Sequence, residues 1–267
     1  MEPSVPLRAL VYDVDGTLAD HFKPPPAAIR ALVAELDAAG VPQVLASGKL
    51  HEYLGGLARG LGLSATGWVI GENGATIYDW SRLLYELEGD YGEDVNELRR
   101  LLWNGPLSPE EYYEEPKFAS ITIFPRDRDL GKSERVLQLA KKLSAERGLH
   151  LAPEVHPDSA VDILQEGVNK GRALWAVAGK LGLRPEEFAA FGEGVNDQAM
   201  MELAYPVAPA DAHPAIRELV DRRGGYLATR PGPQGVLEGF WYLRERGLTA
   251  FALPAWLEEY RPEGESL

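Results

Sequence analysis

The stretch Leu7–Thr17, with the sequence LRALVYDVDGT, joins a strand-like apolar run to an acidic turn. Its apolar and β-branched residues predict a buried strand over Leu7–Val14. The strand ends where Asp13 and Asp15 stand two residues apart and Gly16 permits a sharp turn. In open α/β sheets, ligands bind beyond the carboxyl ends of the strands. The stretch therefore predicts a parallel sheet with a binding site at the carboxyl ends of its strands.

Strand-like and helical segments alternate over much of the remaining chain. Further strands are predicted at Val41–Ala46, Trp68–Ile70, Ala75–Tyr78 and Phe188–Phe191, and helices at residues 24–39, 51–61, 171–181 and 197–204. Such alternation is typical of an α/β fold, in which helices cover both faces of a parallel sheet. A core domain is therefore predicted over residues 1–80 and 165–253.

The segment between the two parts of the core has a different pattern. Over residues 81–164, helices are predicted at 90–103 and 132–147 and strands at 118–124 and 160–164, without strict β-α-β order. This pattern favours a separate α+β module that is inserted into the core domain. The last segment, residues 254–267, is rich in Pro and Glu and is predicted to be a loosely held tail.

Three further polar segments follow predicted strands or open predicted helices. Ser47 and Gly48 come after the second strand, where a hydroxyl and backbone N–H groups could hold a phosphoryl oxygen. Lys170 opens a helix, so its ammonium lies near the positive helix end, where anions collect. The loop Gly192–Asp197 adds two carboxylates, and hard oxygen ligands on tight loops suit magnesium.

Each of these segments also has a plainer interpretation. Asp-x-Asp-Gly is ordinary turn material, and most lysines are solvated on the surface. A calcium-binding EF-hand loop starting at Asp13 is excluded, because Leu18 and Pro24 replace its glycine and glutamate. A dinucleotide-binding loop at 192–197 would need a third glycine where Asp197 stands. The Gly131 segment lacks the earlier glycine of a P-loop, since position 126 is Arg.

Composition narrows the classes of partner. The 267 residues carry a formal net charge of −14 and contain no cysteine. Such an acidic chain repels nucleic acid, so any phosphate site must be made locally. Disulfides and thiolate metal sites are excluded, and the scattered histidines do not predict a zinc site. With no secretory leader and no long apolar run, the expectation is a cytoplasmic protein that does not associate with membranes.

Taken in chain order, the four polar segments resemble the four motifs of the haloacid dehalogenase superfamily. Residues 13–17 match motif I, Ser47 matches motif II, Lys170 matches motif III and the loop 192–197 matches motif IV. The resemblance covers nearly the whole chain except the tail. It implies a Rossmann-like core, an inserted cap domain and a phosphatase activity that depends on magnesium.

The resemblance implies catalytic and metal-binding roles for four residues. Asp13 would attack phosphorus and form an aspartyl-phosphate, while Asp15 would protonate the leaving oxygen and then activate water. Mg²⁺ would be held by Asp13, the backbone carbonyl of Asp15, Glu193 and Asp197. One departure is that motif IV usually begins Gly-Asp, whereas here the acidic residue is Glu193, which is one methylene longer.

The resemblance also implies a phosphate-binding set. Ser47, Gly48, Lys170 and Asn196 would contact phosphoryl oxygens or order the site. Motif II is often followed by Gly-Arg, and here Lys49 stands at the arginine position. Lysine keeps the charge but lacks the two-pronged geometry of arginine. Lys49 is therefore also a candidate for substrate specificity.

The large insertion lies between motifs II and III, which resembles the C2 type of cap. Glu72–Ala75 resembles the Glu-Asn-Gly-Ala segment of C2-capped sugar phosphatases, and a plain turn between two strands is the alternative. Three groups are similar in pattern: Cof-type phosphatases, archaeal-type phosphoglycolate phosphatases and mannosyl-3-phosphoglycerate phosphatases. The implied substrate is thus a small phosphorylated metabolite, either a sugar phosphate or a phospho-organic acid.

Cap residues of such enzymes choose the substrate, so specificity candidates are Asn73 before the cap and Lys117 and Arg126 within it. Solvated charges are the alternative for the last two. The glutamates between positions 110 and 115 are expected to form a solvated helical face. Two other functions stay open from the sequence, namely a phosphomutase of the phosphomannomutase type and a non-catalytic module that binds phosphate.

Overall fold

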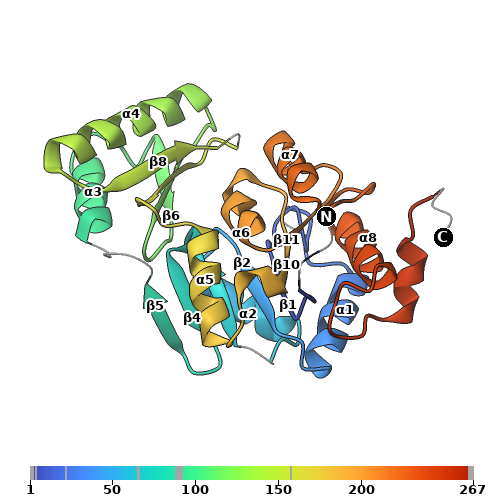
Figure 1. Cartoon of the computed structure of the whole chain (residues 1–267). Helices are drawn as coiled ribbons and strands as arrows, with labels where there is room; N and C mark the ends of the chain where they lie inside the picture. Colours follow the sequence, from blue (N-terminus) through green and yellow to red (C-terminus); the bar gives the residue numbers. More distant parts are fainter. Residues whose placement is uncertain are drawn as a thin grey trace. The chain divides into compact units, whose positions relative to one another are not determined.

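The computed structural model describes residues 3, 5–21, 23–64, 67–87, 93–156 and 158–263. The chain forms two compact units, residues 1–85 with 169–267 and residues 86–168 (Figure 1). We call the first unit the core and the second the cap. The predicted boundaries at 80/81 and 164/165 therefore differ slightly from those of the structure. The difference at the first boundary arises because strand β5 (Leu84–Leu87) begins inside the core unit and pairs with the core sheet.

Within the described residues, the core is built on one eight-stranded sheet. From one edge to the other its strands are β12 (Tyr226–Leu227), β11 (Tyr205–Ala208), β10 (Phe188–Phe191), β1 (Ala9–Tyr12), β2 (Gln43–Ala46), β3 (Trp68–Gly71), β4 (Thr76–Asp79) and β5. Neighbouring strands from β12 to β3 pair in parallel, and β4 runs antiparallel to β3. The predicted parallel sheet is confirmed, with β1 flanked by β2 and β10.

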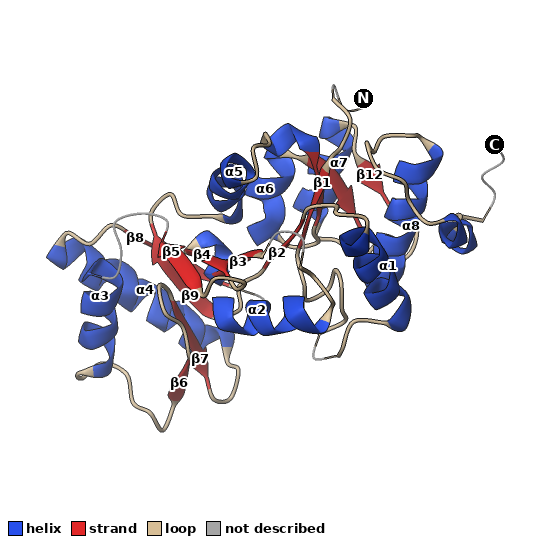
Figure 2. Cartoon of the chain, turned by 90° about the horizontal axis from the view of Figure 1, so that it is seen from below, coloured by secondary structure: helices blue, strands red, loops and turns tan. Residues whose placement is uncertain are grey.

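Helices cover both faces of this sheet (Figure 2). Leu10 and Tyr12 of β1 point into one hydrophobic cluster, and Ala9 and Val11 point into the other. The first cluster includes residues from α1 (Ala27–Ala38), α2 (His51–Gly60), α8 (Gly232–Glu245) and the 3₁₀ helix η4 (Ala255–Tyr260). The second includes residues from α5 (Lys170–Lys180), α6 (Gln198–Leu203) and α7 (Pro214–Arg223). This confirms the predicted Rossmann-like arrangement. The remaining 3₁₀ helices are η1 (Glu72–Gly74), η2 (Pro185–Glu187) and η3 (Val195–Asp197).

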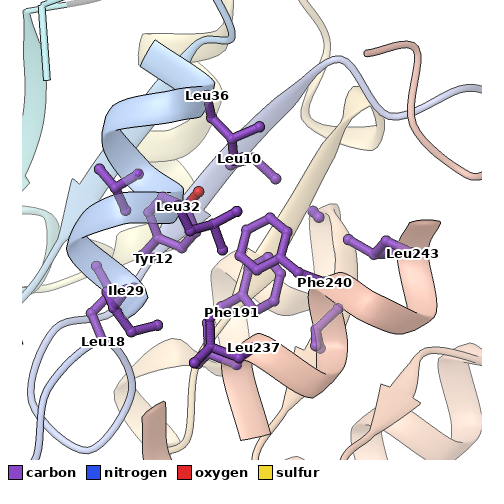
Figure 3. Close-up of a cluster of buried hydrophobic side chains, with 14 of the residues drawn as sticks. Leu10, Tyr12, Leu18, Ile29, Leu32, Leu36, Phe191, Leu237, Phe240 and Leu243 are labelled. Atoms are coloured by element: carbon purple, nitrogen blue, oxygen red, sulfur yellow. The ribbon is translucent and has the colours of Figure 1, made fainter. Parts of the chain in front are cut away.

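Aromatic packing fixes the end of β1, where the acidic turn begins (Figure 3). The Tyr12 ring centroid lies 5.5 Å from that of Phe191, which stacks on Phe240 at 4.6 Å. The Tyr12 hydroxyl donates a hydrogen bond to Gln43 Oε1 at 2.9 Å, so the polar end of this buried ring is satisfied. Burying each large apolar side chain contributes about 1.5–3 kcal/mol, so this packing stabilises the base of the acidic turn.

The C-terminal segment packs against the core more closely than its composition predicts. Leu257 in η4 is fully buried, and Glu258 accepts a hydrogen bond from the Trp241 indole at 3.3 Å. The predicted loose tail is therefore wrong for residues 255–260. Apolar side chains spaced between the Pro and Glu residues provide the contacts. Residues 264–267 of the predicted tail lie outside the described part of the chain.

The cap has its own sheet and its own hydrophobic core. In its described residues, β6 (Tyr112–Glu115), β7 (Ile121–Pro125), β9 (Val161–Gln165) and β8 (Leu151–Val155) form an antiparallel sheet in that order. Helices α3 (Glu93–Trp103) and α4 (Leu130–Arg147) share one hydrophobic cluster with this sheet. The predicted α+β character of the inserted module is confirmed.

The glutamates near position 110 do not form the helical face that we expected. Residues 112–115 are strand β6, in which Glu114 faces helix α3. Its two carboxylate oxygens accept hydrogen bonds from Arg99 Nε at 2.6 Å and Trp103 Nε1 at 2.7 Å. The helix prediction was wrong because it rested on the charges and not on the β-propensity of the two tyrosines at 112 and 113.

No helix in the described residues is long and apolar enough to cross a membrane.

An ion pair in the cap predicts a pH-dependent contribution to stability. His156 Nε2 lies 3.3 Å from Asp162 Oδ2, and this hydrogen bond, helped by the charges of Glu154 and Asp158, raises the pKa of His156 above its ordinary 6.5. Burial alone would raise the pKa of Asp162, but bonds from His156 and Thr122 lower it overall. The stabilisation by His156 is lost as pH rises through its raised pKa, and that by Asp162 is lost as pH falls through its lowered pKa.

We therefore expect His156→Gln to lower the free energy of unfolding by about 1 kcal/mol near pH 5.5 and by much less at pH 9. Urea unfolding of the whole protein at both pH values measures this difference. His150→Gln is the matched control, because His150 is an exposed cap histidine whose contact with Glu166 is 3.9 Å long. An equal effect of His156→Gln at both pH values would contradict the role of the ion pair.

Candidate active site

The acidic turn follows β1 directly and is held by backbone hydrogen bonds. Asp13 N donates to Phe191 O at 2.8 Å, which ties the turn to β10, and the Asp13 side chain is nearly buried, with the residue 5% exposed. Gly16 has φ of 80°, a conformation that favours glycine, and its N–H donates to Ala19 O at 2.7 Å. Asp15, partly buried, precedes this turn and lies inside the wider loop that is closed where Ala19 N donates to Val14 O at 2.9 Å.

Lys170 joins two of the predicted acidic segments. Its Nζ donates to Asp13 Oδ1 at 2.7 Å and to Asp197 Oδ1 at 2.6 Å, and the lysine is 0% exposed. The side chain starts from the first residue of α5, where Asn169 caps the helix by accepting a hydrogen bond from Arg172 N at 2.9 Å. The hydrogen bond of Asn169 fixes the N-terminus of α5, and this helix end places the fully buried Lys170 ammonium between two carboxylates.

The loop after β10 holds Asp197 from the other side. Asp197 Oδ2 accepts hydrogen bonds from the N–H groups of Glu193 and Gly194, both at 2.9 Å. Gly192 has to be glycine, because a Cβ there would lie 2.6 Å from the Cβ of Asp197. The carboxylate of Asp197 is therefore bound on both oxygens and cannot turn away from Lys170.

The segment after β2 forms a second group of contacts. Ser47 is buried, its N–H donates to Ile70 O at 3.0 Å, and its Oγ accepts from Lys49 N at 3.3 Å. The exposed Asn196 reaches this region, because its Nδ2 donates to Asn73 Oδ1 at 3.0 Å. The structure thus places Ser47, Gly48 and Asn73 together and joins them to the loop that carries Asp197.

The charges of Asp13, Glu193, Asp197 and Lys170 do not balance one another. Burial and the charge of Asp197 raise the pKa of Asp13 to about 7, although Lys170 partly offsets them. Burial and Asp197 also raise the pKa of Glu193. Burial alone would lower the pKa of Lys170, but Asp13 and Asp197 outweigh it and raise the pKa. Three carboxylates thus share one ammonium, so the site favours an additional positive charge.

The oxygen atoms around Asp13 fit a magnesium ion better than they fit a metal that needs all of its ligands from the protein. Asp13, Glu193 and Asp197 would supply carboxylate oxygens, and the backbone carbonyl of Asp15 would supply another oxygen. In the described residues, no three acidic or histidine side chains form a ready metal cage. Magnesium usually keeps several waters and binds through one or two carboxylates together with substrate phosphate, so a complete cage is not required. The surplus negative charge is what fits this ion.

Glu193 lies against the acidic turn. A Cβ at Gly16 would be 3.0 Å from Glu193 Cγ, so the extra methylene of glutamate occupies space that glycine leaves open. Two residues that the sequence did not single out also act on this carboxyl. The charge of His21 lowers the pKa of Glu193, and that of Asp211 raises it. Neither lies in a recognisable motif, so only the fold could identify them.

The two cap candidates lie at opposite ends of β7. The Lys117 side chain is 3% exposed, and its Nζ pairs with Glu115 Oε2 at 3.2 Å. Arg126 is exposed, and its Nε donates to Pro109 O at 2.8 Å. The solvated alternative does not hold for Lys117, since its ammonium is buried.

Sequence comparison gives the chain relatives over most of its length. The family model described as haloacid dehalogenase-like hydrolase matches residues 10–97 and 108–224. A phosphoglycolate phosphatase from Haloarcula marismortui is 30% identical over 220 residues, which cover 80% of this chain and 88% of the relative. A phosphoglycolate phosphatase from Archaeoglobus fulgidus is 29% identical over 247 residues, covering 88% of this chain and 96% of the relative.

Solved structures show the same fold at lower identity. A haloacid dehalogenase-like hydrolase from Bacteroides thetaiotaomicron has a TM-score of 0.68 and 22% identity, covering 83% of this chain and 94% of the other. The sucrose-phosphatase from Synechocystis, solved with sucrose and phosphate, has a TM-score of 0.61 and 19% identity, covering 88% and 98% of the two chains. These likenesses establish the architecture of the core with its cap.

Proposed function

Because the chain belongs to the haloacid dehalogenase-like hydrolases and is a phosphatase, we propose that it hydrolyses a small phosphomonoester with Asp13 as its nucleophile. The observation that carries this proposal is the buried Lys170 ammonium, 2.7 Å from Asp13 and 2.6 Å from Asp197. A carboxylate fixed in this way at the end of a central strand is positioned rather than merely solvated. Positioning and charge stabilisation are what phosphoryl transfer mainly requires of a protein.

In the first step, Asp13 attacks phosphorus in line with the leaving oxygen. Lys170 binds Oδ1, so we assign the attack to Oδ2. A bond forms between this oxygen and phosphorus while the bond from phosphorus to the ester oxygen breaks. Asp15 donates a proton to the departing alkoxide as general acid, which leaves an aspartyl-phosphate and a free alcohol.

In the second step, water cleaves the aspartyl-phosphate. Asp15, now deprotonated, takes a proton from the attacking water, which releases inorganic phosphate and restores the Asp13 carboxylate. Asp13 and Asp15 are two residues apart in the chain, and the turn that carries them is held by the hydrogen bonds from Asp13 N to Phe191 O and from Ala19 N to Val14 O. The acid of the first step is thus regenerated in the second.

The phosphoryl oxygens are held by groups that surround this loop. We assign this role to Ser47, the N–H of Gly48, Lys170 and Asn196. Hydrogen-bond donors that are already in place stabilise charge as it develops in the transition state without further reorganisation. The contacts of Ser47 with β3 and of Asn196 with Asn73 support such preorganisation.

Magnesium would be held by Asp13, the Asp15 carbonyl, Glu193 and Asp197. When bound, the ion supplies positive charge that neutralises phosphoryl oxygens and keeps Asp13 ionised. The raised pKa values of Asp13 and Glu193 support this assignment, because both reflect uncompensated negative charge. Asp197 binds Lys170 and two N–H groups, so it also orders the loop that carries Glu193.

For the substrate we propose a small phospho-organic acid, with phosphoglycolate as the first candidate. Its support is the name shared by relatives that align over most of this chain. Sugar phosphates and mannosyl-3-phosphoglycerate are the next candidates from the Glu72–Ala75 pattern and Lys49. The specificity residues proposed are Lys49 in the core and Lys117 or Arg126 in the cap.

The test is phosphate release from a panel of phosphomonoesters, assayed with magnesium and then with chelator. The panel contains phosphoglycolate, mannosyl-3-phosphoglycerate, hexose phosphates and an aryl phosphate. We expect the fastest release from phosphoglycolate and a loss of at least about 100-fold with chelator. Release that is indifferent to chelator would overturn the metal assignment. Absence of release from every member would favour a bisphosphate-activated mutase, or a phosphate-binding module if that assay also fails.

A further inference from the structure

The turn between β3 and β4 has an unusual backbone. Glu72 has φ of 51° and Asn73 has φ of 54°, so two successive residues with side chains adopt the left-handed conformation. Among the described residues, this is the one adjacent pair of non-glycine residues with positive φ. Each such residue costs about 1–3 kcal/mol and persists only where its surroundings enforce it. Asparagine tolerates this conformation better than most residues, whereas glutamate does not.

On one side, the turn holds the segment that carries Ser47. Glu72 N donates to Lys49 O at 3.0 Å, and Asn73 N donates to Ser47 O at 3.1 Å. Between these two bonds lies Gly48, where an added Cβ would be 3.3 Å from both Oδ1 and Nδ2 of Asn73. The left-handed backbone thus aims two N–H groups at the ends of a three-residue segment and places the Asn73 amide against its middle.

On the other side, the turn meets the remaining polar segments. Gly74 has φ of 102°, and a Cβ there would lie 2.2 Å from Asn169 O and 2.8 Å from Lys170 N, so the two backbones are in direct contact. The Asn73 side chain accepts the hydrogen bond from Asn196 Nδ2 at 3.0 Å. One turn therefore touches the segments of Ser47, Lys170 and Asn196.

We propose that Asn73 is a positioning residue for phosphoryl transfer, and that its amide fixes Asn196 and the Ser47–Lys49 segment relative to each other. This inference rests on the proposed function, because it assumes that Ser47 and Asn196 bind phosphoryl oxygens. It replaces a direct role of Asn73 in substrate choice. Asn73 acts through Asn196 and Gly48, so its loss weakens phosphate binding for every substrate to a similar degree.

Asn73→Gly separates this role from that of a plain turn. Glycine adopts φ of 54° without strain, so the backbone bonds to Ser47 and the thermal stability stay near those of the wild type. The variant lacks only the amide. We expect kcat/KM to fall about fivefold, the size of one lost hydrogen bond, and the inhibition constant of inorganic phosphate to rise by a similar factor.

A double-mutant cycle with Asn196→Ala tests the bridge itself. Because Asn73 acts in part by holding Asn196, Asn73→Gly is expected to have a clearly smaller effect in a protein that already carries Asn196→Ala than in the wild type. The matched control is Leu83→Gly, at another left-handed position with φ of 56° that is 75% exposed and far along the chain from the phosphate-binding segments. We expect this control to leave kcat/KM and phosphate inhibition unchanged.

The inference is overturned if Asn73→Gly keeps wild-type kcat/KM and phosphate inhibition, or if its effect adds fully to that of Asn196→Ala. The proposed function fails separately, when the wild type releases no phosphate from the panel. In that case calorimetric titration with inorganic phosphate and magnesium still reports on the bridge. Unchanged phosphate affinity in Asn73→Gly would then overturn the inference, and an affinity about fivefold weaker would support it.

Discussion

Asp13→Asn is expected to lower kcat by at least about 10⁴-fold while the protein remains folded, because an amide cannot attack phosphorus. Asparagine has nearly the same shape as aspartate, and Lys170 keeps its bond to Asp197 at 2.6 Å. Phosphate release under saturating substrate measures the loss, and circular dichroism checks the fold. Residual activity near that of the wild type would show that Asp13 is not the nucleophile.

The same variant is expected to be more stable than the wild type at neutral and alkaline pH when metal is removed. Burial and Asp197 raise the pKa of Asp13 from 3.8 to about 7, so the folded protein holds a proton that the unfolded chain releases. Stability from this group is therefore complete below about pH 4 and is lost as pH rises through about 7. Asparagine does not titrate. Urea unfolding in chelator should show a larger gain at pH 8 than at pH 5, and equal gains would contradict the pKa assignment.

Lys170→Met is expected to destabilise the protein by about 3–5 kcal/mol at pH 8 and to lower kcat at least about 100-fold. Methionine fills much of the same volume but leaves Asp13 and Asp197 buried together without a positive charge. The ammonium is 0% exposed, so water cannot take its place. Urea unfolding measures the stability, and the phosphate-release assay measures kcat.

Lys180→Met is the matched control on the same helix. Lys180 lies in the last turn of α5, is exposed, and places its ammonium 5.2 Å from the ring centroid of Trp68. Its loss is expected to cost less than about 1 kcal/mol and to leave kcat unchanged. If Lys170→Met were as mild as this control, the buried ammonium would not be the element that organises the site.

The core fold was predictable wherever local pattern and tertiary structure agree. The apolar strand before Asp13, the strand over Phe188–Phe191 and the helix after Lys170 all have clear periodicity and clear ends. Helix α8 was not predicted, because its three glycines and Pro233 are poor helix formers. Packing of Phe240 against Phe191 stabilises it instead, and such long-range contact leaves no local signal.

The residues that make up the site were predictable from the sequence, but the hydrogen bonds that join them were not. Motif order alone suggested that Asp13, Lys170 and Asp197 meet, and the structure gives the two distances that join them. The bond between Asn73 and Asn196 depends on a left-handed backbone that sequence patterns do not encode. The sequence also suggested that Lys117 is solvated, whereas its side chain is buried and pairs with Glu115.

The central place of β1 has a consequence for the order of folding. Ala9 pairs with Phe188, so β1 gains this neighbour only after the whole cap has been synthesised. Closing so long a loop is entropically costly, and parallel pairing between distant segments is slow. The strand pairs of the cap all lie within residues 112–165, so the cap is expected to fold first on the ribosome. Catalytic competence therefore arises only after the cap has been made, when Lys170 and Asp197 reach an Asp13 that precedes the cap in the chain.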